Sequence, residues 1–103
     1  MNIKTPTKKM FSSDSSEKTG DICIGDVIFI RAITFHYVGR VTRVSENFVH
    51  LEEASWVADS GRFGEALSLG TLNDVEPMGK CMISLNAIVD VAEWRHPLPK
   101  EAK

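Results

Sequence analysis

Apolar and polar residues alternate along the first half of the chain in a pattern typical of short strands. Residues 22–33 are dense in β-branched and aromatic side chains, and Gly25 interrupts them near the start. Residues 48–54 follow a polar turn and direct Val49 and Leu51 to one face. The segment between them, 34–44, has two faces: Phe35, Tyr37 and Val41 on one, and His36, Val38, Arg40 and Thr42 on the other.

The longest strand signal lies near the end of the chain, over residues 81–94. Asn86-Ala87 predicts a bend that divides this segment into two short strands, and the prolines after residue 96 end it because proline cannot donate to a ladder. Gly39, inside the second segment, predicts a sharp bend or bulge of the kind that curls strands into barrels. Four or five strands with little helix predict an all-β fold, a small bent antiparallel barrel.

Composition divides the chain into one domain and two tails. Residues 1–20 hold few large apolar side chains and cannot offset the entropy of ordering, so they predict a flexible N-terminal tail. Residues 21–99 are expected to form a single β-barrel domain, followed by a short C-terminal tail at 100–103. Within the domain, residues 55–80 predict a long loop insert, in which 61–67 have room for one helical turn capped by Asp59 or Ser60.

Charge is distributed unevenly along the chain. Of the 12 basic and 14 acidic side chains, residues 1–20 hold four and two, so the rest of the chain holds 8 and 12. A net acidic domain makes nucleic acid an unlikely partner, because that affinity grows with the number of neutralised phosphates. Cys23 and Cys81 are too few for a disulfide framework. With no apolar leader and no run of 18 apolar residues, we expect a cytoplasmic protein without membrane contact.

Two parts of the chain resemble the Sm-like proteins, small barrels related to the SH3-like class that assemble into rings. The resemblance rests on residues 25–27, 37–41 and 45–54, with their glycine-led strand, glycine-bent strand and polar turn, and on 83–91 as a closing strand pair. It implies a barrel and a ring-like homo-oligomer. Asn86-Ala87 stands where many of these proteins have the Arg-Gly pair that helps hold an RNA base, so uridine binding is not implied.

The chain as a whole also resembles a family of small phage and prophage proteins. That resemblance implies a viral setting, and hence the host cytoplasm, without implying an activity.

The insert holds the sharpest candidate site. Trp56, Arg62 and Phe63, with Asp59, are suited to stack a planar base and hold a phosphate. The alternative is that both rings fasten the insert to the barrel, with Arg62 paired to an acid. A second set, His36, Tyr37 and Arg40, would line a groove beneath the insert or form a half-polar face.

The C-terminal segment offers a candidate interface. Trp94 and Leu98 lie on a proline-stiffened stretch, where they would dock onto a neighbouring subunit or fold back on their own barrel. Catalysis is not expected, because the three histidines lack metal-ligand spacing and no nucleophile motif or phosphate-cradling loop is present. We expect neither a metal nor another cofactor.

These observations lead to three functional hypotheses. The first is a non-enzymatic, oligomeric protein that sequesters a small nucleotide-type ligand, in a phage setting a sponge for host immune signalling nucleotides. The second is a structural or assembly ring of a phage particle. The third, an Sm-like ring that binds RNA, is disfavoured by the acidic domain and the missing Arg-Gly pair.

Overall fold

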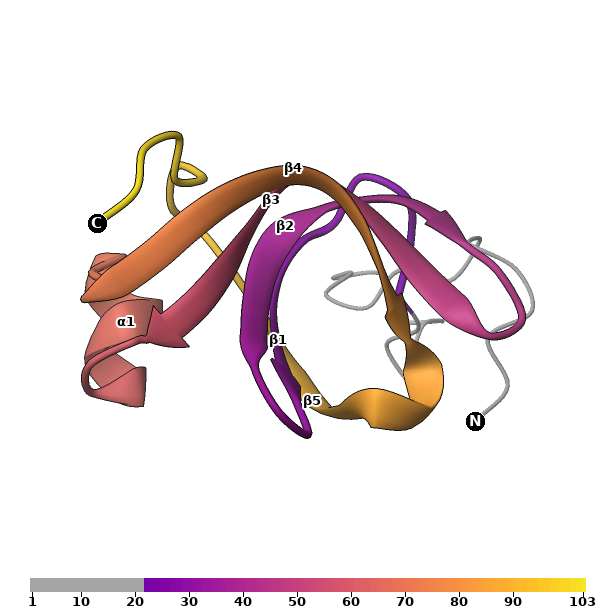
Figure 1. The fold of residues 1–103 in the computed structure, drawn as a ribbon, viewed down its shortest axis with the longest axis horizontal. Coiled ribbons are helices and arrows are strands. Elements are labelled where there is room, and N and C mark those ends of the chain that lie inside the picture. Colours follow the sequence, from indigo (N-terminus) through magenta and orange to yellow (C-terminus); the bar gives the residue numbers. More distant parts are fainter. Residues whose placement is uncertain (1–21) are drawn as a thin grey trace, which may run out of the picture.

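The fold is all-β, as predicted: a single five-stranded antiparallel sheet with one short helix. We describe residues 22–103 of a computed structural model (Figure 1). The tail predicted at residues 1–20 lies outside them. The elements follow one another as β1 (Val27–Ala32), β2 (His36–Val44), β3 (Phe48–Asp59), α1 (Phe63–Leu69), β4 (Asp74–Ser84), a 3₁₀ turn (Leu85–Ala87) and β5 (Ile88–Glu93). The strand order across the sheet is β4-β3-β2-β1-β5.

The sheet curls but does not close into a barrel. Figure 1 shows β4 arching from α1 to the 3₁₀ turn at the opposite end of the molecule. In the described structure β4 pairs with β3 and β5 pairs with β1, so these two strands form the edges. The bend predicted at Asn86-Ala87 is confirmed, because the 3₁₀ turn lies there and separates β4 from β5.

The prediction of a long loop insert at 55–80 was wrong. The strand that was expected to end at residue 54 continues to Asp59, and β4 begins at Asp74, seven residues before its predicted start. The two extensions pair with each other, for example Val57 with Val75, and both of these side chains are buried. Only residues 60–73 connect them, and α1 occupies half of that stretch. Neither Asp59 nor Ser60 caps the helix, whose N-cap is Arg62.

A line of special backbone positions crosses three neighbouring strands and bends the sheet. Gly39 on β2 lies so close to β3 that an added Cβ would be 3.1 Å from the Cα and Cβ of Ala54. On β3, Glu53 has φ 50, and on β4 Gly79 has φ 80. The strand registers shift at these same places. The bend predicted at Gly39 is thus confirmed as part of a set of bulges.

The sheet buries a separate hydrophobic cluster on each face. The inner face holds the first cluster: Ile22, Ile28, Ile30, Val41, Val49, Leu51, Ala54 and Ile83. The outer face holds the second: Phe29, Val38, Val57, Ala66, Leu72, Val75, Trp94 and Leu98. Two expectations for 34–44 change as a result. Val38, assigned to a polar face, is fully buried, and Phe35, grouped with apolar residues, is exposed.

The C-terminal segment folds back on its own chain. Trp94 is only 3% exposed and Leu98 is 8% exposed, both within the outer cluster beside α1. The indole donates to the carbonyl of Pro97 at 3.4 Å, and His96 Nε2 lies 2.7 Å from the carbonyl oxygen of Leu67. The hypothesis of a subunit interface required Trp94 and Leu98 to be exposed, and both are buried. Burying the apolar surface of a large indole is energetically more favourable than leaving it exposed to water.

Two glycine substitutions should have opposite effects on stability. Gly39→Ala forces a methyl group against the backbone of Ala54, so we expect it to lower the free energy of unfolding by about 1–3 kcal/mol. Gly64→Ala, in α1, has open space around the new methyl group and should raise it by about 0.5–1 kcal/mol. Urea denaturation of both variants checks this. Equal stabilities would show that Gly39 does not constrain the bend.

Candidate functional site

The residues predicted to form a nucleotide clamp do not converge. Trp56 pairs across the sheet with Tyr37, which packs on the inner cluster, and the indole contacts Phe35 edge-on with ring centroids 5.1 Å apart. Phe63 instead packs on the outer cluster with Val57. Because neighbouring strand residues point to opposite faces, Trp56 and Phe63 lie on opposite sides of the sheet.

The other predicted ligand-binding residues are also separated. Arg62 is exposed at the start of α1, and Asp59 accepts a hydrogen bond from the Gly61 amide at 2.8 Å. Arg40 forms an ion pair with Glu53. A joint stacking surface and anion clamp in the insert therefore does not form, because β3 extends through the segment and distributes its side chains between two faces.

His36 and Phe63 belong instead to an outer-face cluster that fastens α1 to the sheet. The guanidinium of Arg31 lies over the ring of Phe63, 4.4 Å from its centroid, and forms a two-point ion pair with Asp90. His36 contacts Phe29 with ring centroids 5.7 Å apart, and Phe29 contacts Phe63. The hydrogen bond from Arg31 lowers the pKa of Asp90. The guanidinium of Arg31 and the rings of His36 and Phe63 therefore contact groups within the protein.

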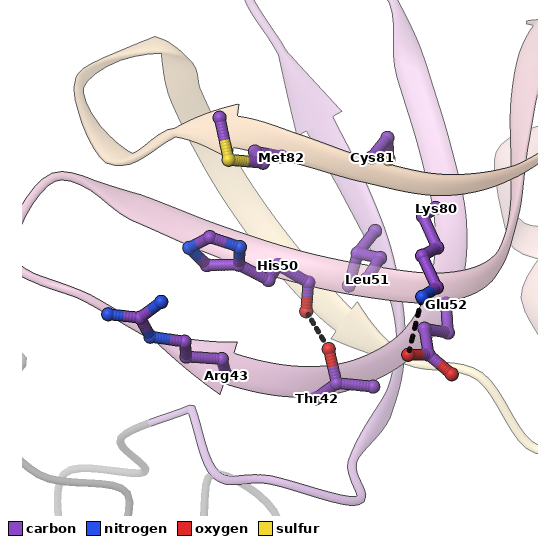
Figure 2. A pocket seen from close by; sticks show the side chains of 8 residues that line it. All are labelled: Thr42, Arg43, His50, Leu51, Glu52, Lys80, Cys81 and Met82. Carbon is purple, nitrogen blue, oxygen red and sulfur yellow. Dashed lines mark hydrogen bonds and ion pairs between the residues drawn. The ribbon is translucent and has the colours of Figure 1, made fainter.

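A groove on the outer face of β2, β3 and β4 offers a more open arrangement (Figure 2). Its volume is about 360 Å³. It is lined by Thr42, Arg43, His50, Leu51, Glu52, Lys80, Cys81 and Met82. The alternation of β3 places these polar side chains here, because Val49 and Leu51 face the inner cluster and His50 and Glu52 therefore point outward.

Three lining residues form a row across the strands at one end of the groove. Arg43 is the cross-strand partner of His50, and His50 is the partner of Met82. Directly opposed residues lie within about 4.5–5.5 Å at their Cβ atoms, so one small ligand can touch neighbouring members of the row. Figure 2 shows the guanidinium and the imidazole projecting at this end. The row combines a cation, a flat ring and a polarisable thioether.

The other end of the groove carries a charge pair. Lys80 Nζ lies 4.0 Å from a carboxylate oxygen of Glu52 (Figure 2). Between the two ends, the Thr42 hydroxyl donates to the His50 carbonyl at 3.4 Å and keeps its own lone pairs available. Burial raises the pKa of the Cys81 thiol, so the thiolate is disfavoured at neutral pH. The groove can thus hold an anion and hydrogen-bond to neighbouring polar groups.

Part of this groove could be predicted from the sequence. The outward direction of His50 and Glu52 follows from the pattern of 48–54. Arg43 was not singled out, because a register shift between Val41 and Arg43 brings it opposite His50 and no pattern along one strand reveals such a shift. Lys80 was assigned to a loop.

A second groove lies against the C-terminal segment, with a volume of about 460 Å³. Its floor includes the buried residues Leu72, Val75 and Leu98, and Lys100 and Lys103 are among its other lining residues. The backbone of Lys103 exchanges two hydrogen bonds with Val75, at 2.9 and 3.3 Å. This contact anchors the segment to the first half of β4.

Comparison of the chain with protein-family models, curated proteins and solved structures gives no match. Within residues 22–103, no helix has the length and apolar character needed to cross a bilayer. The same part of the chain contains no group of three or more His, Cys, Asp or Glu side chains placed to hold a metal ion.

Breaking the Arg31–Asp90 pair should destabilise the protein in a pH-dependent way. Because the folded pKa of Asp90 is below the unfolded value of about 3.9, its contribution is present above that pH and is lost as the pH falls through the folded pKa. We expect Asp90→Asn to lower the melting temperature at pH 7 and the deficit to shrink below about pH 4. Thermal melts across pH 3–7 test this, with Asp74→Asn as control. A deficit independent of pH would contradict it.

Proposed function

We propose that this protein is a non-enzymatic binding protein that sequesters a small nucleotide-type ligand in the groove between β2 and β4. The observation that carries the proposal is the row formed by Arg43, His50 and Met82. A guanidinium binds phosphate through paired, charge-assisted hydrogen bonds, and flat or polarisable side chains offer a contact surface to a base. The ligand class is the one expected from the sequence, at a different place in the fold.

The absence of an ion pair at Arg43 within the described residues supports this choice. Arg43 forms no ion pair with any residue in the described range 22–103, whereas Arg31, Arg40 and Arg95 each have a carboxylate partner. An arginine without a carboxylate partner, beside an imidazole and in a concave surface, is available to an anionic ligand. The net acidic character of the domain favours a small anion over a long polyanion.

The proposal involves binding without turnover. The lining residue with the greatest intrinsic nucleophilicity is Cys81, and its raised pKa keeps the thiol protonated. Cys81 is therefore a poor nucleophile, and binding is the function that we propose for the side chains of this groove.

Titration calorimetry with nucleoside phosphates, cyclic dinucleotides and cyclic ADP-ribose tests the proposal. We expect at least one of them to bind, and Arg43→Ala to weaken that binding by about tenfold or more through loss of a charge-assisted hydrogen bond. Arg62→Ala is the matched control, because it removes another exposed arginine outside the groove and should have no effect. Absence of binding across the panel, or equal effects of the two substitutions, would contradict the proposal.

The open sheet supports a second candidate, a homo-oligomer with an assembly role. Strands β4 and β5 are both edges of the described sheet, and although Val75 of β4 bonds to Lys103, edge strands are templates for another chain. Met78 on β4 and Val89 on β5 are exposed large apolar residues. Pairing between the edges of successive copies would cover them.

Native mass spectrometry of the full chain tests this second candidate. We expect oligomers in the wild type, and Val89→Lys should shift them toward monomers because a buried charge opposes edge pairing. Leu69→Lys is the control, since Leu69 is equally exposed (66%) but lies on α1. A monomeric wild type, or equal effects of the two substitutions, would argue against assembly through these edges.

A further inference from the structure

The two cations of the groove differ in their surroundings. Lys80 is exposed and lies 4.0 Å from a carboxylate oxygen of Glu52, so an anion that approaches Lys80 also meets this negative charge. Arg43, at the other end, forms no ion pair within residues 22–103 and has an imidazole beside it. The formal charges of the lining residues Arg43, Lys80 and Glu52 sum to +1. A groove of this kind has one strong position for an anionic group rather than two.

The groove's size agrees with a small ligand. At about 360 Å³ it falls near the lower end of the roughly 300–1,000 Å³ range of small-molecule sites. That space suits a single nucleotide. His50 and Met82 continue the row away from Arg43, so a base next to a phosphate held by Arg43 would rest on the imidazole and the thioether.

The remaining polar groups match a sugar. Glu52 on β3 presents a carboxylate and Thr42 on β2 presents hydroxyl lone pairs, and both residues line the groove (Figure 2). Carboxylates commonly accept hydrogen bonds from the hydroxyl groups of ribose. Lys80, close to Glu52, adds a donor for a ring or sugar oxygen.

We infer that the ligand is a nucleoside monophosphate: one phosphoryl group at Arg43 and His50, a base on His50 and Met82, and a ribose beside Glu52. This inference rests on the proposed function of the groove and narrows it to ligands with a single phosphoryl group. Ligands with two phosphates, including cyclic dinucleotides, gain no second strong contact, because the carboxylate of Glu52 beside Lys80 repels a second phosphate.

The test compares ligands that differ only in phosphate number. We would titrate the wild-type chain with the four ribonucleoside monophosphates, the corresponding nucleosides and triphosphates, and cyclic di-AMP. One monophosphate should bind at least about tenfold more tightly than its nucleoside, and no less tightly than the triphosphate or cyclic di-AMP. Arg43→Gln should remove the preference over the nucleoside, whereas Lys80→Gln should change affinity less than about threefold. Thermal melts establish that both exposed-site variants remain folded.

Each contrary outcome identifies what is wrong. If the triphosphate or cyclic di-AMP binds about tenfold more tightly than any monophosphate, and Arg43→Gln and Lys80→Gln cause equal losses, the single-phosphate inference is overturned while nucleotide binding stands. If a monophosphate and its nucleoside bind equally, the phosphoryl contact at Arg43 is overturned. If no ligand in the panel binds, both the inference and the proposed function are overturned.

Discussion

The close approach of Gly39 to Ala54 is the contact on which the rest of the structure depends. A Cβ at residue 39 would lie 3.1 Å from the Cα of Ala54, so this close crossing of the two strands favours a residue without a side chain. The positive φ of Glu53 and Gly79 continues the bend into β3 and β4. This line divides the twelve residues of β3 into two halves and bends the sheet around the inner cluster.

The bend also explains why the sheet has two cores. Beyond it, the second half of β3 and the first half of β4 cover Phe29 and Val38 on the outer face, together with α1 and the C-terminal segment. A domain of this size gains stability by burying apolar surface on both sides of its sheet. Trp94 and Leu98 belong to that second core. The ion pair of Arg31 and Asp90 then fastens the edge strand β5 beside the helix.

The proposed site occupies the part of the outer face that the second core leaves open. Before the bend, β3 directs its apolar residues to the inner cluster and its polar residues outward, and neither α1 nor the C-terminal segment covers them there. Arg43 and Lys80 reach this surface from β2 and β4. A single bend thus separates a segment of β3 used for packing from a segment whose side chains are available to a ligand.

Local pattern was enough to predict the strands, the all-β class, the break at Asn86-Ala87 and the outward direction of His50 and Glu52, because a period of two residues sets the faces of a strand directly. It failed for residues 55–59 and 74–80, where pairing between β3 and β4 stabilises strands that their own composition marks only weakly. The sequence pattern also grouped Trp56 and Phe63 in one predicted site and did not include Arg43. Which side chains share a surface depends on register and bulges between strands, and these are decided only when distant segments pack against one another.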